Sequence, residues 1–394
     1  MKRYIKHIIL LFSVILAVSC SESFLDYTPK GKLGGDMLNA PEHLDKLVTA
    51  AYASLGNDDW DPSISHMWIW GSVRSDDAFK GGGSVGDQGE MDFMEQFVTI
   101  RTDLGKPNRF WTNVYEGIGR ANDALARIDL ATEADYPQKI EREAELRFLR
   151  GHWYFLLKIL FKNPVWIDET VAKEEIKNIP NLVYTSDEFW DKIAEDFEFA
   201  ANNLPLLQDE VGRASQTAAW AYLAKVRLYQ AYEQNDKHEV VNINEDRLQQ
   251  VITLTDYVIN SGKHSLSPDF ADNFLVETKN GPESIFAIQF SVDDGTPTGR
   301  IFKAAGLNYN MAPEYGCCDF HNPSQNMVNA FRTDEDGLPL HDTFNEVTLR
   351  NPEDFWNNSI DPRFDHTIGV AGHPFKYVPD WIYQPNWRRA PHVY

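Results

Sequence analysis

The chain has 394 residues, with 37 Lys and Arg against 59 Asp and Glu, so its formal net charge is −22. Hydrophobic residues make up 43% of the sequence and aromatic residues 13%, which excludes a disordered chain and is enough for a substantial core. The length predicts either two domains or one extended repeat array. The acidic surplus argues against nucleic acid as a partner, because affinity for phosphates is built from Lys and Arg.

The N-terminus has the pattern of an export signal. A positively charged stretch, residues 1–7, precedes a run over residues 8–17 that is apolar except for Ser13. This run is too short to span a bilayer, which takes about 20 apolar residues. Cys20 follows at the expected cleavage point, which predicts removal of residues 1–19 and lipidation of Cys20. An ordinary secretory peptide with an incidental cysteine is the alternative.

Cleavage and cysteine usage bound the chemistry of the mature chain. Removing residues 1–19 takes away three basic side chains, so the charge becomes 34 − 59 = −25. Besides Cys20, only the adjacent Cys317 and Cys318 remain, and neighbouring cysteines rarely bridge each other because the geometry is strained. With only His321 nearby, no zinc site is predicted. We expect no metal and no cofactor.

Helical periodicity dominates the first two thirds of the chain. A polar, glycine-containing tether over residues 20–40 leads into segments whose apolar residues recur at spacings of three and four. The predicted helices cover residues 41–55, 108–128, 139–162, 186–203, 215–233 and 245–261. Ser186 is the predicted N-cap of the fourth. Trp220 opens a partial tetratricopeptide pattern in which Arg227 stands at the next aromatic position.

The last third of the chain has a different amino-acid composition. Residues 263–394 are rich in Pro, Gly, Asn, Asp and aromatic residues, and only residues 284–290 alternate like a short strand. The sequence therefore predicts a mainly α fold, a tetratricopeptide-like helical-repeat superhelix with a large irregular, loop-rich portion and a few short strands. The predicted division is a helical-repeat region at 41–262 and an irregular ligand-binding region at 263–394.

Two motifs are weak evidence for catalysis or metal binding. Residues 81–86 (GGGSVG) satisfy both a dinucleotide-binding and a nucleophile-elbow pattern, but neighbouring carboxylates would repel phosphate, so a flexible loop is favoured. Residues 334–337 (DEDG) have the oxygen density of a calcium loop without its full ligand spacing, and a solvated turn is favoured.

Two clusters of aromatic and polar residues are candidate ligand sites. Indole and phenol rings stack on the C–H faces of sugars, while planar polar groups bind the hydroxyls. The candidate binding residues are Trp60, Trp68, Arg74 and Asp77 in the first cluster and Tyr309, Tyr315 and Phe320 in the second. The alternative for Trp68 is a place in a local core with Trp70. Trp356 and Trp381 are further candidate ligand residues, and for each of them a place in the core is the favoured interpretation.

The assembled features resemble the SusD/RagB family of outer-membrane nutrient-binding lipoproteins. The resemblance runs in order along the whole mature chain. It rests on residues 20–31 (CSESFLDYTPKG), 75–82 (SDDAFKGG), 115–125 (YEGIGRANDAL), 144–161 (AELRFLRGHWYFLLKILF), 212–229 (GRASQTAAWAYLAKVRLY), 283–290 (ESIFAIQF), 323–331 (PSQNMVNAF) and 361–364 (DPRF).

The resemblance implies a non-enzymatic protein on the outer face of an outer membrane, held by its lipid anchor. It implies a TonB-dependent transporter of the SusC type as partner, and a glycan, or in some members a peptide, as ligand. Chains of the family usually continue beyond a segment like residues 389–394 (RAPHVY) into a final helix pair. We therefore expect a truncated chain with an exposed apolar face on the repeat helices, and a divergent member that is complete at Tyr394 is the alternative.

The leading functional hypothesis is capture of oligosaccharide or polysaccharide and its delivery to the transporter, without catalysis. An exported glycoside hydrolase is an alternative, although 59 acidic residues single out no catalytic pair. A repeat scaffold that binds only protein or peptide is another.

Overall fold

The computed structural model describes residues 35–56, 67–290, 311–312 and 318–389. Its α-helices are α3 (Pro41–Gly56), α4 (Gly89–Glu95), α5 (Gly105–Leu130), α6 (Lys139–Phe161), α7 (Ser186–Asn203), α8 (Gln216–Ala231), α9 (Glu245–Asn260), α11 (Gln325–Ala330), α12 (Pro352–Asn357) and α13 (Phe364–Thr367). Its strands are β1 (Ala78–Gly81), β2 (Tyr232–Gln234), β3 (Val240–Ile243), β4 (Phe320–Pro323), β5 (Pro374–Phe375) and β6 (Val378–Ile382). They pair as three antiparallel two-stranded sheets, β1–β4, β2–β3 and β5–β6. Short 3-10 turns complete the described chain: η1 (Gly35–Asn39), η2 (Met67–Ile69), η3 (Ile176–Asn178), η4 (Phe270–Asn273), η5 (Val276–Thr278), η6 (Phe344–Glu346) and η7 (Pro385–Trp387).

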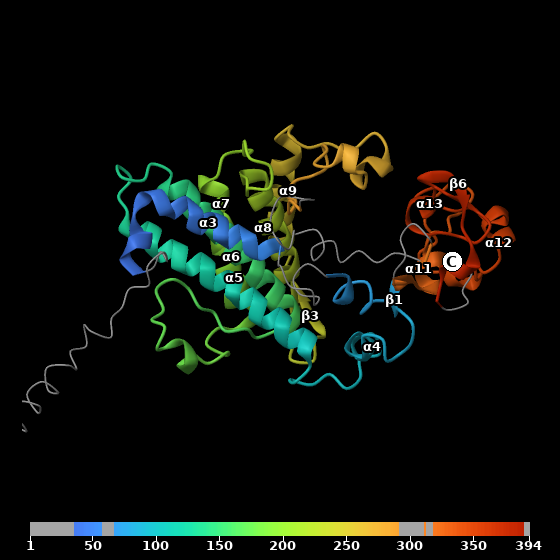
Figure 1. The fold of residues 1–394 in the computed structure, drawn as a ribbon, viewed down its shortest axis with the longest axis horizontal. Helices are drawn as coiled ribbons and strands as arrows, with labels where there is room; N and C mark the ends of the chain where they lie inside the picture. Colours follow the sequence, from blue (N-terminus) through green and yellow to red (C-terminus); the bar gives the residue numbers. More distant parts are fainter. Residues whose placement is uncertain (1–34, 57–66, 291–310, 313–317, 390–394) are drawn as a thin grey trace, which may run out of the picture.

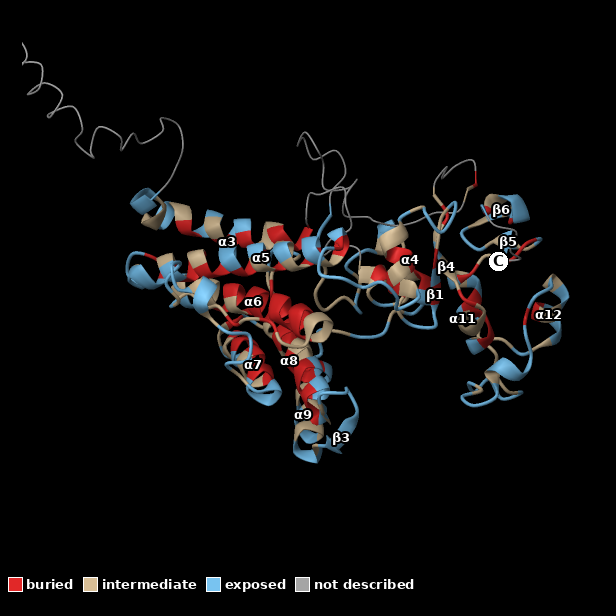
Figure 2. Cartoon of the chain, turned by 90° about the horizontal axis from the view of Figure 1, so that it is seen from below, coloured by how far each residue is buried: buried red, intermediate tan, exposed pale blue. Residues whose placement is uncertain are grey.

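Helices α3 and α5–α9 form the helical array, in which each helix packs on the next (Figure 1). Their apolar faces share one core, and α6 is buried along most of its length (Figure 2). The largest side chains of this core, Trp153, Tyr154 and Phe148, lie on α6 and are fully buried. The predicted fold class, a tetratricopeptide-like helical-repeat superhelix with few short strands, is therefore confirmed.

Side-chain caps set where the array helices begin. The N-cap of α7 is Thr185, not Ser186 as predicted, because Thr185 and Glu188 form a reciprocal capping box. Ser215 caps α8 by accepting the amide of Ala218. Thr185 and Ser186 both carry a hydroxyl that could cap α7. Thr185 is the cap because a carboxylate, that of Glu188, lies three positions after it.

Ion pairs connect neighbouring helices inside the array. The Arg150 guanidinium on α6 donates to both carboxylate oxygens of Asp196 on α7, at 2.8 and 2.7 Å, and it also bonds Asn122 on α5. Arg227 on α8 pairs with Asp191 and Glu198 on α7. This contact explains why an arginine stands where the tetratricopeptide pattern has an aromatic residue: the charge joins two helices.

The last helix of the array, α9, has an exposed side that carries apolar residues. Val258 is its only buried residue within the part of the chain that the structure describes. Its outer side carries Ile252, Tyr257 and Ile259, which are 53%, 49% and 68% exposed. The adjoining β3 is exposed along its whole length.

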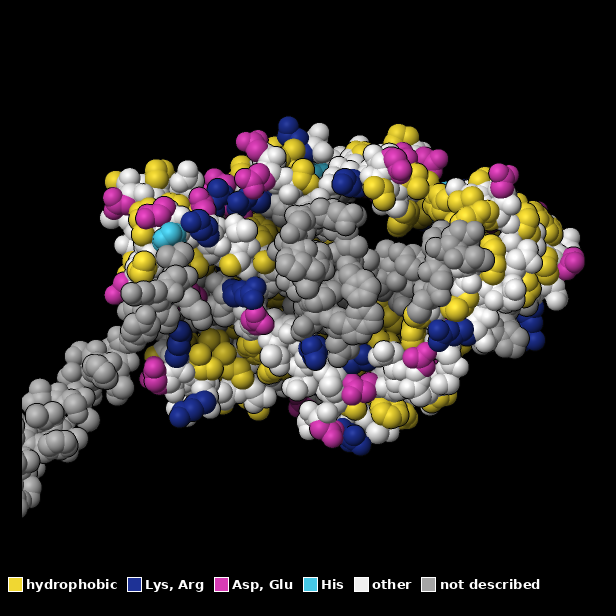
Figure 3. All heavy atoms as spheres, in the orientation of Figure 1, with side chains coloured by type: hydrophobic (Ala, Val, Ile, Leu, Met, Phe, Trp, Pro, Cys, Tyr) yellow, Lys and Arg dark blue, Asp and Glu magenta, His cyan; other side chains and the backbone are white. Residues whose placement is uncertain are grey.

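We define the C-terminal cluster as residues 318–389, which lie to one side of the array (Figure 1). It has its own small core of six buried residues: Val328, Leu349, Phe355, Phe364, Ile368 and Val370. Hydrophobic side chains gather over this side of the molecule, on the right of Figure 3.

The prediction of a strand at residues 284–290 is wrong. The segment is irregular and pairs with no strand among the described residues. Ile285, Phe286 and Ile288 instead pack on the core of the array, so the alternation reflects contact with helices rather than a sheet. Across the described ranges, no helix is both long and apolar enough to cross a bilayer.

Candidate functional site

A two-stranded ribbon joins the two candidate clusters. Strand β1 pairs with β4 in antiparallel register, with Ala78 opposite Pro323 and Gly81 opposite Phe320. The first cluster lies just before β1 and the second just before and within β4, so segments separated by about 240 positions become neighbours. We call β1, β4 and the residues packed on them the ribbon site.

Trp68 is half-buried and lies against the second cluster. Its indole stacks on the imidazole of His321 with a centroid distance of 4.9 Å and an interplanar angle of 26°. His321 is fixed in turn by the Ser72 hydroxyl, 2.6 Å from its Nε2, and burial lowers the pKa of the imidazole. Trp68 also packs on a small core of Ile69, Met91 and Met94. The core alternative for Trp68 is therefore partly correct, and the ring is held in place.

Arg74 supplies a positioned cation. Its guanidinium lies 4.5 Å from the ring centroid of Phe97, a geometry that a cation and an aromatic face favour. Burial lowers the pKa of Arg74. Within the described residues no hydrogen bond or ion pair uses this guanidinium, so its N–H groups remain available as donors.

Asp77 supplies an exposed acceptor beside Arg74. Its main chain is fixed, because its carbonyl accepts the Ser324 amide at 2.9 Å and its amide donates to the Ser75 hydroxyl. Its carboxylate accepts no hydrogen bond within the described residues. The ribbon site therefore holds a free donor set and a free acceptor set on a fixed backbone.

Phe320 is fixed by two glycines. Gly82 has a φ of +79°, and a Cβ added there would lie 2.5 Å from the Phe320 ring. A Cβ on Gly81 would lie 2.3 Å from the carbonyl oxygen of Asp319. Only glycine allows the loop backbone to approach the ring this closely. The half-buried Phe320 ring thus rests against the backbone of the loop.

The glycine-rich loop closes around an internal cation instead of a phosphate. The buried Lys80 ammonium donates to the carbonyls of Ser84 and Asp87, both at 2.8 Å. The Asp87 carboxylate accepts the Gly83 amide and the Arg389 guanidinium. Because these groups satisfy one another, the loop is held at the ribbon by its own contacts.

A C-terminal segment, residues 387–389, packs on the ribbon site, and we call it the strap. Asp319 is 1% exposed, and its carboxylate pairs with the guanidinium of Arg388 at 2.8 Å and accepts the amide of Arg389 at 2.7 Å. The carbonyl of Asp319 accepts the Gly82 amide. Sequence reasoning missed Asp319, His321 and Arg388, because only the fold shows that these residues meet.

Four predicted residues lie outside the described part of the chain. They are Cys20, Trp60, Tyr309 and Tyr315. The expectation that the adjacent cysteines form no disulfide is wrong for Cys318, which is disulfide-bonded. The turn predicted at residues 334–337 is confirmed, since the Asp334 carboxylate accepts the amides of Asp336 and Leu338. No group of side chains suited to a metal ion occurs within the described ranges.

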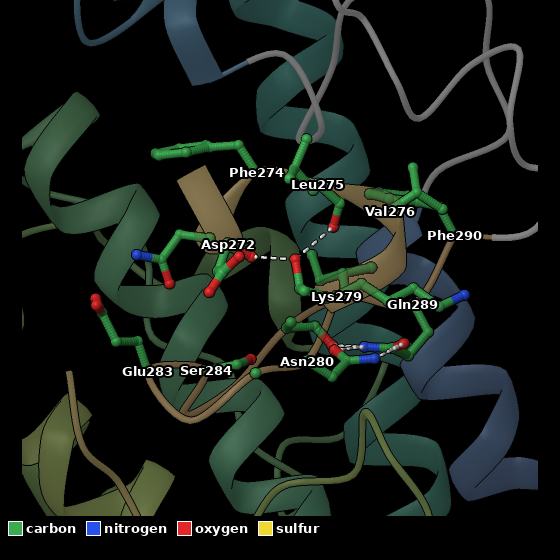
Figure 4. Close-up of a pocket in the computed structure, with 15 residues that line it drawn as sticks. Asp272, Phe274, Leu275, Val276, Lys279, Asn280, Glu283, Ser284, Gln289 and Phe290 are labelled. Atoms are coloured by element: carbon green, nitrogen blue, oxygen red, sulfur yellow. Dashed lines mark hydrogen bonds between the residues drawn. The ribbon is translucent and has the colours of Figure 1, made fainter. Parts of the chain in front are cut away.

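A hollow of about 560 Å³ lies away from the ribbon, between η4, η5 and residues 280–290 (Figure 4). None of the predicted residues lines it. Its amides already pair with each other, because Asn280 and Gln289 exchange two hydrogen bonds of 3.0 Å, and Glu283 accepts the Ser267 amide. With these polar groups engaged inside the protein, the hollow is a weaker candidate than the ribbon site.

The family profile described as "Starch-binding associating with outer membrane" matches residues 23–228, and the chain belongs to this SusD-like family. A SusD-like protein of Bacteroides ovatus is 24% identical over 78% of this chain and 53% of its own length. SusD-like protein P2 of Formosa agariphila is 26% identical over 80% of this chain and 59% of its own. The chain thus spans little more than half the length of these curated relatives.

Solved structures share the fold. Surface glycan-binding protein A of Bacteroides thetaiotaomicron, solved with laminarihexaose, aligns over 73% of this chain and 60% of its own, with a TM-score of 0.58 and 21% identity. A SusD-like protein of Bacteroides fragilis aligns over 79% of this chain and 56% of its own, with a TM-score of 0.60 and 20% identity. At these identities the likeness concerns the fold alone.

Proposed function

We propose that this chain is a non-catalytic lipoprotein of the outer membrane surface that binds oligosaccharide and passes it to a SusC-type TonB-dependent transporter. Membership of the SusD-like family supports the class of function. The observation that carries the location is the ribbon itself, which brings both candidate clusters together through the Trp68–His321 stack.

The ribbon site has the chemistry of a neutral-sugar site. Trp68 and Phe320 are aromatic rings whose positions are fixed by their packing, so little side-chain entropy is lost when a sugar ring stacks near them. Arg74 donates and Asp77 accepts, which suits a hydroxyl that does both. Trp60, Tyr309 and Tyr315 are proposed to extend this surface, because they precede the ribbon strands in the sequence.

The test uses the chain from Ser21 onward, without the leader and Cys20, in native gels that contain laminarin, starch or another neutral polysaccharide. We expect retardation in at least one gel. Phe320→Ala and Trp68→Ala should each lower the affinity by about tenfold, because each removes an aromatic contact surface. Tyr257→Ala is the matched control, since Tyr257 is an exposed aromatic residue on α9.

Two results would contradict the proposal. Release of reducing ends during incubation would favour the hydrolase alternative, and no retardation in any gel would favour a scaffold that binds protein or peptide. The anchor is tested separately: labelled palmitate should be incorporated into the full chain and not into its Cys20→Ala variant.

A further inference from the structure

The C-terminal cluster exposes a tryptophan beside its own core. On α12, Phe355 is 7% exposed and contributes to the core, whereas the adjacent Trp356 is 68% exposed. A large apolar ring this open to water is unusual in a folded protein. The favoured core interpretation of Trp356 is therefore wrong, while Trp381 is half-buried and contacts Trp387.

One face of the Trp356 indole packs on a neighbouring ring. The imidazole of His373 stacks on it with a centroid distance of 4.4 Å and an interplanar angle of 19°. Asn351 and Asp354 form a capping box that fixes the start of α12. The indole is thus a flat ring held by its neighbours, with its second face open.

A polar hollow lies on the other side of His373. It has a volume of about 180 Å³ and lies between α13 and the β5–β6 hairpin. Its polar lining includes Asp365, His366, Lys376 and Tyr377, and the Tyr377 hydroxyl lies 3.0 Å from Nδ1 of His366. His373 also lines this hollow.

His373 links the ring and the hollow. Its Nε2 is buried and has no hydrogen-bond partner among the residues that the structure describes. A buried polar nitrogen without a partner is costly. Since Asp365 and Lys376 carry opposite charges, the hollow favours neither anions nor cations.

We infer that Trp356, His373 and the adjoining hollow form a second saccharide site, which takes a neutral pyranose of the same glycan chain. The inference rests on the proposed function and places a site that the ribbon does not include. One sugar ring stacks on the open face of Trp356, and hydroxyls of a residue further along the chain reach the hollow. Two sites on one protein retain a polysaccharide more strongly than either site alone.

Isothermal titration with laminarihexaose and with maltohexaose tests this assignment on the chain from Ser21 onward. The first probe is the ligand in a fold relative, and the second represents starch. We expect two hexasaccharides per wild-type chain and one per Trp356→Ala chain. Phe320→Ala should also bind one, and the double variant none. In gels containing the matching polysaccharide, Trp356→Ala should lower the affinity by about tenfold.

Two control variants separate stacking from general damage. Trp356→Phe keeps an aromatic surface and should retain two bound hexasaccharides. Leu338→Ala removes an apolar side chain that is 62% exposed in the same cluster and should also retain two. His373→Ala should weaken the second site without unfolding the array, as followed by helical circular dichroism.

The outcomes distinguish this inference from the proposed function. One bound hexasaccharide in the wild type, lost in Phe320→Ala and kept in Trp356→Ala, would overturn the second site alone. Binding that is lost in Trp356→Ala and unchanged in Phe320→Ala would support the second site and overturn the ribbon site. No binding by the wild type to either probe or any polysaccharide would overturn both.

Discussion

The helical array buries its largest aromatic side chains, whereas the C-terminal cluster leaves its large Trp356 ring open to water. In the array, Phe148, Trp153 and Tyr154 are fully buried on α6. In the C-terminal cluster, a core of six residues leaves Trp356 and Tyr377 exposed at 68% and 38%. The contrast fits the proposed division, in which the array stabilises the protein and the cluster, with the ribbon, holds the proposed ligand sites.

The two regions also differ in how they treat charge. The array buries Arg150 and Asp196 together with Glu145, whose carboxylate accepts from Arg142 and Arg213 at 2.6 and 3.0 Å. The ribbon site pairs the buried Asp319 and Arg388 in the same way, but its half-buried Arg74 and its exposed Asp77 have no ion-pair partner within the described residues. Buried charges that are paired hold a structure together, whereas free ones on a fixed backbone are ready for a ligand.

The comparison between the two regions fails if the buried charges of the array contribute little to the free energy of unfolding. Arg150→Met would leave Asp196 buried without its main partner, and burial already raises the pKa of Asp196. We expect the free energy of unfolding to fall by about 3–5 kcal/mol, measured by urea titration with helical circular dichroism. Arg101→Met is the control, because the Arg101–Asp103 pair is exposed and is worth about 0–1 kcal/mol. Equal midpoints for both variants would contradict the role of the array.

Two glycines on one helix sharpen the contrast. A Cβ on Gly117 would lie 2.5 Å from the Trp153 ring, whereas a Cβ on Gly119 meets nothing within 4 Å. Gly117→Ala should therefore lower the free energy of unfolding by about 3 kcal/mol, at the upper end of overpacking costs. Gly119→Ala should raise it by about 0.5–1 kcal/mol. Sugar affinity under native conditions should change in neither variant if binding belongs to the other region.

A buried histidine gives the array a pH dependence of its own. Burial and, to a smaller extent, the Lys225 ammonium together lower the pKa of His152 to about 4. In the unfolded chain this imidazole titrates near 6.5, so below that pH the unfolded state binds a proton that the folded state does not. Stability is complete above pH 6.5 and is lost as the pH falls toward 4.

This loss amounts to roughly 2 kcal/mol between pH 7 and pH 5, since each pKa unit is worth about 1.36 kcal/mol. His152→Gln should remove that slope in urea titrations at the two pH values. The Tyr222 hydroxyl, 2.7 Å from Nδ1 of His152, can also bond the glutamine amide. An unchanged slope would place the pH sensitivity outside the array.

Sequence alone predicted the array well because its signals are local. Apolar spacing placed α7 at residues 186–203, as observed, and the helix predicted at 215–233 begins within one residue of α8. The competing cap at Thr185 and the short β2 after α8 depend on geometry that periodicity does not carry.

The sites were harder to predict because they depend on long-range pairing. Trp68, Arg74, Asp77 and Phe320 were chosen by residue type, yet nothing in the sequence indicated that the two clusters meet. Trp356 was a candidate ligand residue for which the core was favoured, and only the packing shows that Phe355 turns inward and Trp356 outward. Residue type therefore identified candidates, while their meeting required the fold.

The strap, residues 387–389, contacts residues that lie much earlier in the sequence. These contacts have a consequence for folding. Arg389 contacts Asp87 across 302 positions, and Arg388 pairs with Asp319. Contacts between helices that follow one another form early, whereas contacts this distant form late. We therefore expect the array to fold first and sugar binding to appear afterwards, so that a refolding chain passes through a helical stage without ligand affinity.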